Sequence, residues 1–94
     1  MKTIIIGCGR IGSGLALKLN QSAHDITVID QDPLTFKHLG AGFKGETIAG
    51  VGFDRDVLLA AGIERADSLA AVTSNDEANA LTARIASQIF GVPR

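Results

Sequence analysis

The chain has 94 residues, the size of one small domain, and its 46% hydrophobic and 20% charged residues exclude an intrinsically disordered protein. A formal net charge of −1 argues against a protein that coats nucleic-acid phosphates, because such proteins present a basic surface. The single cysteine, Cys8, rules out an internal disulfide and fits a reducing compartment. No apolar run is long enough for a signal peptide or a membrane span, so we expect a cytoplasmic protein.

The first half of the chain predicts two strands, each followed by a helix. Residues 2–6 and 26–29 are short β-branched runs typical of strands buried on both faces. Between them, Ile11, Leu15 and Leu19 recur every four residues and predict the apolar face of a helix over 10–20. Asp32 followed by Pro33 predicts a second helix start, and we expect this helix to stop at Gly40.

The second half repeats the alternation. Residues 46–49 and 69–73 predict two further strands. Asp54 is expected to cap a short helix that Gly62 closes, and Ser74 or Asn75 to cap a longer helix that continues to Phe90. The apolar stripe predicted for this last helix consists of Ala78, Leu81, Ile85 and Ile89.

Regular alternation of strands and helices predicts an α/β fold: a Rossmann-like, doubly wound parallel sheet of about four strands in the order 3-2-1-4, with helices on both faces. Residues 69–72 are too apolar for a bare edge strand in water. The sequence ends at Val92-Pro93-Arg94, where a fifth strand is expected. We therefore expect residues 1–94 to be a single domain and the N-terminal part of a longer one, with coverage of this edge by another chain as the alternative.

A glycine-rich motif follows the first predicted strand. Gly7-Cys8-Gly9-Arg10-Ile11-Gly12 matches the pattern G-x-G-x-x-G between a strand and a helix, the context that dinucleotide binding requires. We expect the first glycine to allow a tight turn, the second to let a pyrophosphate approach the backbone, and the third to let helix and sheet pack closely. The helix N-terminus then directs unpaired N–H groups at the phosphates.

Asp30 ends the second predicted strand, about twenty residues after the motif, where such sites place a ribose-binding acid. Its carboxylate can accept hydrogen bonds from a ribose 2′-hydroxyl and repels a 2′-phosphate, and Asp32 adds to that repulsion. The sequence therefore favours NAD, NADH, ATP or ADP and makes NADP an unsuitable ligand.

Several residues near the predicted crevice keep two interpretations. Arg10 either contacts a phosphate or is solvated, and Cys8 is either a small buried filler or a redox-sensitive thiol whose pKa the helix ends lower. Thr73, Ser74 and Asn75 contact the ligand or serve the helix cap. Phe53 either flanks an adenine or packs in the core.

Other signs of chemistry are weak. His24 and His38 stand apart from other metal-ligating residue types, so we predict no metal site. No acid–base pair or activated nucleophile forms a recognisable catalytic set.

Four stretches together resemble the N-terminal nucleotide-binding domain of the TrkA/RCK family of potassium transport regulators. They are IIIGCGRIGSGLA at 4–16, VIDQDP at 28–33, GVGFDRDVLLAAGI at 50–63 and AVTSNDEAN at 71–79. The last two stretches separate this family from ordinary dehydrogenases.

The resemblance implies a nucleotide-sensing regulatory domain and no enzyme activity. It implies a homodimer or larger ring on the cytoplasmic face of a membrane-embedded potassium transporter or channel, in which the bound nucleotide shifts the ring between shapes. The ligand-binding residues then expected are Gly7, Cys8, Gly9, Arg10, Ile11, Gly12, Asp30, Gln31, Asp54, Thr73, Ser74 and Asn75.

Two other functions fit parts of the sequence. The cofactor half of an NAD-dependent dehydrogenase would explain the glycine motif and Asp30, but the pattern from Thr73 to Asn79 weighs against it. A DNA-binding regulator that senses NADH would need a basic segment, which the charge of −1 does not provide.

Overall fold

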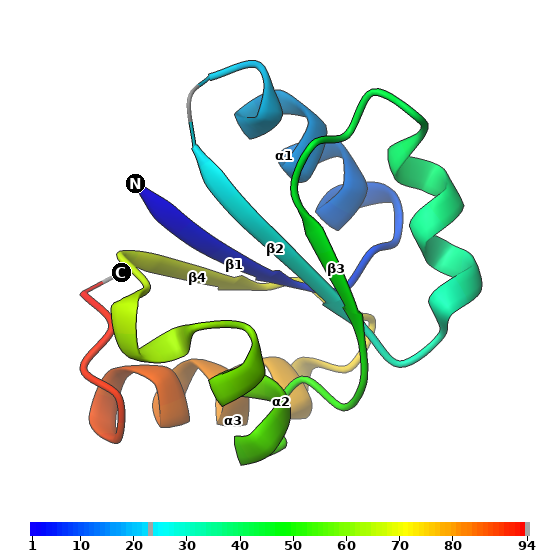
Figure 1. Ribbon diagram of the computed structural model, residues 1–94. Helices are drawn as coiled ribbons and strands as arrows, with labels where there is room; N and C mark the ends of the chain where they lie inside the picture. The colour runs from blue at the N-terminus through cyan, green and yellow to red at the C-terminus, as the bar shows by residue number, and fades with distance from the viewer. Residues whose placement is uncertain (23, 94) are drawn as a thin grey trace.

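A four-stranded parallel sheet forms the centre of the computed structural model, which describes residues 1–22 and 24–93. The strand order is β3-β2-β1-β4, so the predicted Rossmann-like order 3-2-1-4 is confirmed (Figure 1). The strands are β1 (Lys2–Ile6), β2 (Asp25–Asp30), β3 (Glu46–Ala49) and β4 (Ser68–Ala71). All three neighbouring pairs are parallel, so the carboxyl ends of the strands meet at one edge of the sheet.

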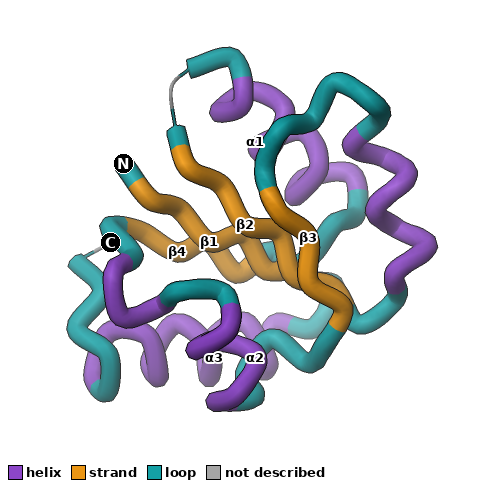
Figure 2. The backbone as a smooth tube through the Cα atoms, viewed as in Figure 1, coloured by secondary structure: helices purple, strands orange, loops and turns teal. Residues whose placement is uncertain are grey.

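Helical segments cover both faces of this sheet (Figure 2). They are α1 (Arg10–Asn20), η1 (Pro33–Leu39), α2 (Arg55–Ala60), η2 (Ile63–Arg65) and α3 (Asp76–Gln88), of which η1 and η2 are 3-10 helices. On one face α1 and η1 contribute Ala16 and Leu39 to a core cluster. On the other, Leu58, Ile63 and Ala86 form a second cluster.

The central strands are buried on both faces because alternate side chains point to opposite sides of a strand. Ile5 and Val28 belong to the cluster beneath α1, whereas Ile4, Ile6 and Ile29 belong to the cluster on the side of α2 and α3. This accounts for continuous β-branched runs in place of alternating polar and apolar residues.

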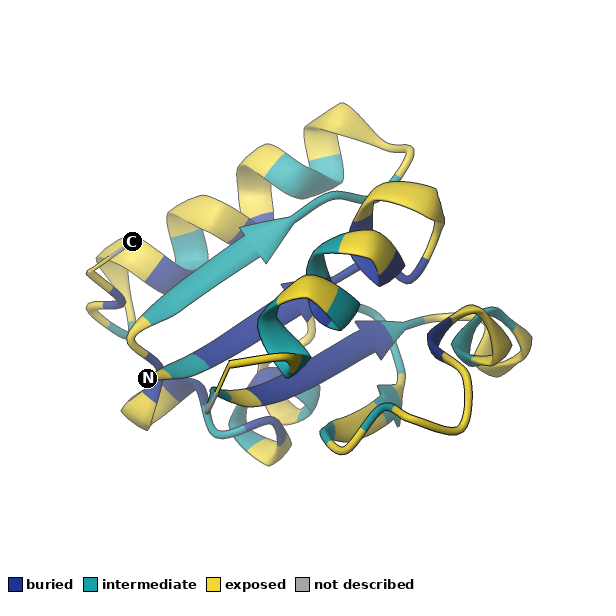
Figure 3. Ribbon diagram, turned by 90° about the horizontal axis from the view of Figure 1, so that it is seen from above, coloured by how far each residue is buried: buried dark blue, intermediate teal, exposed yellow. Residues whose placement is uncertain are grey.

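The edge strand β4 is less covered than its neighbour β1 (Figure 3). All four of its residues are half-buried, whereas four of the five residues of β1 are buried. The predicted strand over 69–73 runs instead from Ser68 to Ala71. Arg94, part of the segment where a fifth strand was expected, lies outside the described residues.

The helix faces predicted from large apolar residues are confirmed only in part, since Leu15, Leu19 and Ile85 are half-buried and pack against the core clusters. In α1, Ile11 is 69% exposed, while Gly12, Ser13 and Ala16 are buried. Small side chains face the sheet here because they let the helix axis approach it closely.

In α3, too, small residues are buried where large apolar residues were expected to face the sheet. Leu81 is 43% and Ile89 70% exposed, and the buried residues are Thr82 and Ala86. Ala78 and Ile85 of the predicted stripe are half-buried. The helix ends at Gln88, two residues before the expected end.

The predicted helix caps are confirmed. The Asp32 carboxylate accepts the N–H of Leu34 at 3.0 Å, and Asp54 accepts two backbone N–H groups of α2. Of the two candidates before α3, Asn75 is the cap, because its Oδ1 accepts the N–H of Ala78 at 2.9 Å.

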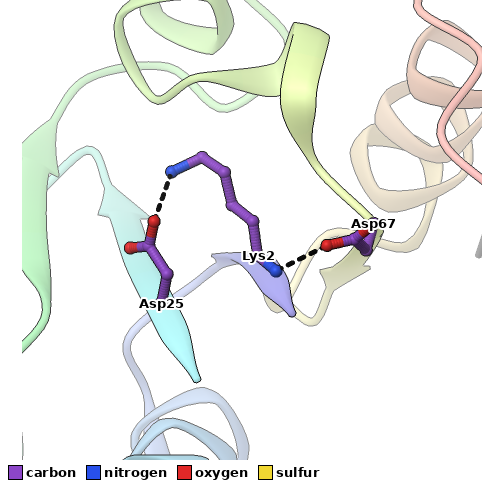
Figure 4. A network of polar contacts seen from close by, with 3 residues as sticks. All are labelled: Lys2, Asp25 and Asp67. Atoms are coloured by element: carbon purple, nitrogen blue, oxygen red, sulfur yellow. Dashed lines mark hydrogen bonds and ion pairs between the residues drawn. The ribbon is translucent and has the colours of Figure 1, made fainter. Parts of the chain in front are cut away.

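Lys2 joins neighbouring segments at the end of the sheet opposite these caps (Figure 4). Its backbone N–H donates to Asp67 at 2.7 Å, and its ammonium group lies 3.3 Å from the Asp25 carboxylate. The Asp25 side chain is 63% exposed, so this ion pair contributes little to stability. Within the described residues, none of the helices is long and apolar enough to span a membrane.

Gly12→Ala tests how closely α1 approaches the glycine turn. A Cβ at position 12 would overlap the carbonyl oxygen of Gly7, so we expect the free energy of unfolding to fall by about 1–3 kcal/mol in chemical denaturation. Gly14→Ala is the matched control, since a Cβ there meets no atom within 4 Å. That variant should gain roughly 0.5–1 kcal/mol, and equal effects at both positions would contradict the packing argument.

Candidate functional site

A cavity of about 380 Å³ lies where the carboxyl ends of the strands meet. Its lining includes residues from the segment that follows each of the four strands. Of the twelve residues predicted to bind a ligand, seven line it: Gly7, Gly9, Asp30, Gln31, Thr73, Ser74 and Asn75. The volume is within the range of small-molecule sites.

The glycine turn forms one wall of this cavity, and its first two glycines are needed for different reasons. Gly7 has a φ of +108°, a backbone conformation that residues with a side chain rarely adopt. A Cβ on Gly7 would also lie 3.0 Å from the Val72–Thr73 peptide. Gly9 lines the cavity, and a Cβ there would meet no protein atom within 4 Å. The space beside Gly9 is therefore free for a ligand.

The Asp30 carboxylate ties this turn to the end of β2. Its Oδ2 accepts the N–H of Cys8 at 2.7 Å, and its Oδ1 accepts the N–H of Asp32 at 2.9 Å. Each carboxylate oxygen can accept more than one hydrogen bond. Asp30 can therefore hold the turn and still accept hydrogen bonds from a ligand hydroxyl in the cavity it lines.

Five predicted residues lie outside the cavity lining found in the described chain: Cys8, Arg10, Ile11, Gly12 and Asp54. Arg10 and Ile11 are exposed on the first turn of α1, and Gly12 is buried against the turn. Asp54 caps α2 with its carboxylate. The structure thus gives Gly12 and Asp54 structural roles beside the cavity.

Cys8 belongs to the glycine turn and is fully buried. Its thiol lies 3.5 Å from the Thr35 carbonyl oxygen, to which it donates. Burial, and then the nearby negative charge of Asp30, raise the pKa of Cys8 above its usual 9.0. The direction is opposite to the lowered thiol pKa considered from the sequence, because burial and the charge of Asp30 both disfavour the thiolate.

The cavity also includes residues outside the twelve that were expected to bind a ligand. Gly50, Gly52 and Phe53 follow β3, and Thr35 and Thr82 come from η1 and α3. Phe53 is 41% exposed and lines the cavity, so of its two interpretations the core role is wrong. Its position after a strand and between Gly52 and the capping Asp54 was the signal available in the sequence.

The raised pKa of Cys8 predicts a pH-dependent loss of stability. A thiol whose pKa is higher in the folded protein than in the unfolded chain stabilises the fold below about pH 9. This contribution is lost as the pH rises through the pKa of the folded protein. Denaturant titrations should therefore show the wild type losing more stability above pH 9 than Cys8→Ala. Parallel curves for the two proteins would contradict this cause.

Comparison with known proteins identifies the family. The TrkA-N domain matches residues 3–94. A Trk system potassium uptake protein TrkA from Streptomyces coelicolor is 50% identical over 92 residues, which cover 98% of this chain and 41% of that protein. The protein of the same name from Halomonas elongata is 41% identical, with 99% of this chain and 20% of that protein covered. The chain thus spans less than half the length of these relatives.

A solved structure supports the fold independently. The C-terminal domain of a Kef protein from Shewanella denitrificans superimposes with a TM-score of 0.82 at 20% identity, covering 96% of this chain and 54% of that one. The resemblance inferred from four sequence stretches is confirmed by the match over residues 3–94. The chain belongs to the TrkA-N domain family.

Proposed function

We propose that this chain is a nucleotide-sensing regulatory domain that controls a potassium uptake system or channel. The observation that carries the proposal is the convergence of the glycine turn and the Asp30 carboxylate on one cavity, in a chain of the TrkA-N family. The two relatives compared above are both named Trk system potassium uptake proteins. We extend that role to this chain.

The cavity offers groups suited to binding. Asp30 is the only ionisable side chain lining it in residues 1–22 and 24–93. The other polar side chains there are hydroxyls and amides, which donate and accept hydrogen bonds but do not titrate near neutral pH. This set supports ligand recognition over general acid–base catalysis.

The ligand proposed is an adenine nucleotide or NAD(H). The Asp30 oxygens accept hydrogen bonds from ribose hydroxyls and repel a 2′-phosphate, which argues against NADP. The similar Kef domain is described in an AMP-bound form, which supports a ligand containing adenosine monophosphate. Phe53 at the mouth of the cavity provides an aromatic face beside which a base could stack.

The partners proposed follow from the family. We place the domain, as a homodimer or larger ring, on the cytoplasmic face of a membrane-embedded potassium transporter, without contact to nucleic acid. Residues 1–94 would be one domain, or the first part of a larger one. A nucleotide regulates such an assembly only if it binds two states of it with different affinity.

Calorimetric titration with NADH, NAD, ATP, ADP, AMP and NADPH tests this function. Binding of one or more adenine nucleotides or of NAD(H), with NADPH excluded, is the expected result. Hydride transfer from NADH to a small substrate in the full-length protein would instead identify a dehydrogenase. Absence of binding by every nucleotide would overturn the proposed site.

Gly9→Ala should separate binding from folding. The new methyl group meets no protein atom but occupies space beside the turn, so we expect ADP and NADH affinity to fall at least about tenfold. The free energy of unfolding should change by about 1 kcal/mol or less. Gly14→Ala adds a methyl group to the same helix outside the cavity lining and should leave affinity unchanged. Wild-type affinity in Gly9→Ala would mean that phosphates do not approach this turn.

Asp30→Ala should weaken ADP and NADH together, because both present an adenosine ribose. It also removes the acceptor of the Cys8 N–H, so stability should fall by about 1–3 kcal/mol. Asp32→Ala is the matched control, since it removes a carboxylate that holds a helix cap and lies outside the cavity lining. Thermal unfolding with and without ligand measures both effects, and equal ligand-induced shifts in the two variants would show that Asp30 is misassigned.

A further inference from the structure

Asn79 on α3 is joined to Thr73 at the cavity by three side-chain hydrogen bonds. The Thr73 N–H donates to Asn79 Oδ1 at 3.0 Å, and Asn79 Nδ2 donates to the Thr73 carbonyl oxygen at 2.9 Å. The third bond joins the Thr73 hydroxyl to the same Oδ1. One side chain thus binds both backbone polar groups and the hydroxyl of a residue six positions earlier.

These contacts fix the direction of the Thr73 hydroxyl. A backbone N–H only donates and a carbonyl oxygen only accepts, so the Asn79 amide has one possible orientation, with Oδ1 toward the Thr73 N–H. Because Oδ1 cannot donate, the hydroxyl donates to it, and the Asn75 carbonyl oxygen, 3.3 Å from the hydroxyl, is a second acceptor for the same proton. Both acceptors belong to the protein, so the hydroxyl proton is not left for a ligand. The hydroxyl also accepts the N–H of Asn75 at 3.2 Å. One lone pair of the hydroxyl oxygen is left for other partners.

The segment held in this way is part of the cavity wall. Thr73 lines the cavity, and the Val72–Thr73 peptide lies so close to Gly7 that an added Cβ would be 3.0 Å away. Asn79 itself is outside the cavity lining of the described chain. Its influence on a ligand therefore passes through Thr73 and through the peptide that borders the glycine turn.

We propose that Asn79 is a positioning residue of the nucleotide site and makes Thr73 a hydrogen-bond acceptor toward the ligand. The inference rests on the proposed function. An acceptor recognises a ribose hydroxyl or an amino or amide N–H, and it repels a phosphate oxygen. Thr73 thus contacts the nucleoside portion of the ligand, and the phosphates lie at the glycine turn.

If Asn79 had only a structural role, its loss would affect ligand affinity no more than the loss of another asparagine that holds a loop. Asn20 is such a residue and provides the comparison. Asn20 Nδ2 donates to the Gly42 carbonyl oxygen at 3.0 Å, and its Oδ1 accepts the Lys44 N–H at 3.2 Å. Asn20 therefore also holds a loop by both backbone groups. It lies at the last residue of α1, at the opposite end from the glycine turn, and is outside the cavity lining.

The test compares Asn79→Ala with Asn20→Ala by calorimetric titration with ADP and with adenosine, at a temperature where circular dichroism shows both variants folded. Asn79→Ala should weaken both probes on the order of tenfold, because the freed hydroxyl and peptide no longer keep their places. Asn20→Ala should change affinity by less than roughly twofold. Adenosine is included because it lacks phosphates, so an equal loss for both probes assigns the contact to the nucleoside.

A double-mutant cycle with Thr73→Val shows whether Asn79 acts through Thr73. Valine removes the hydroxyl and keeps the backbone contacts, and Asn79→Ala should then cost less affinity than it does in the wild type. Where Asn79→Ala fails to fold, Asn79→Asp decides. Its second carboxylate oxygen would face the Thr73 carbonyl oxygen, so adenosine affinity should still fall, with Asn20→Asp as its control.

Wild-type adenosine affinity in folded Asn79→Ala or Asn79→Asp would overturn the inference and leave the proposed function standing. Equal losses in the Asn79 and Asn20 variants would also overturn it, since they would reflect general destabilisation. A loss confined to ADP would place Thr73 against a phosphate and contradict its assignment as an acceptor. Failure of the wild type to bind either probe, or any other adenine nucleotide or NAD(H), would overturn both proposals.

Discussion

The hydrogen bond from the Cys8 N–H to the Asp30 carboxylate, 2.7 Å long, fixes the geometry on which the site depends. It joins the turn after β1 to the end of β2, two segments 22 residues apart in the chain. Because the second oxygen of Asp30 accepts the Asp32 N–H, the carboxylate also sets the path that leads into η1. The acid proposed to bind a ribose is therefore the same group that holds the glycine turn in place.

Close packing of small residues completes this arrangement. α1 rests on the sheet through Gly12, Ser13 and Ala16, and the contact between Gly12 and the Gly7 carbonyl leaves no room for a side chain. The start of the helix is thereby held at the cavity, where its free N–H groups and partial positive charge can meet an anion. A bulkier residue would lift the helix and move those N–H groups away.

The fold and half of the site could be predicted because their signals are local. Strand runs, helix caps and the spacing from Gly7 to Asp30 are properties of short segments, and parallel strands necessarily bring their carboxyl ends together. The buried helix faces could be predicted only in part, because Leu15, Leu19 and Ile85 pack against the core whereas other large apolar residues of the predicted faces are exposed. Apolar periodicity selects large side chains such as Ile11 and Leu81, whereas the depth of packing selects small ones such as Ala16 and Ala86.

The other missed features depend on contacts between segments. The pKa of Cys8 depends on its burial and on the charge of Asp30, which no local pattern near Cys8 describes. The sequence left Phe53 either beside an adenine or in the core, and its place in the cavity lining depends on how the segment after β3 folds. The pattern from Thr73 to Asn79 was visible in the sequence, but the hydrogen bonds between these two residues depend on the turn before α3.

The cavity walls come from separate strand ends, and side-chain hydrogen bonds to the backbone hold them in place. Asp30 connects the first two strand ends, while Asn79 organises the segment after β4. A nucleotide that contacts the glycine turn, Asp30 and Thr73 together would add a connection between these two groups of contacts. Binding would then stabilise one relative placement of the strand ends over others, by an amount that grows with ligand concentration above Kd. That differential stabilisation is what a sensing domain requires, because a ligand that favours no arrangement shifts no equilibrium.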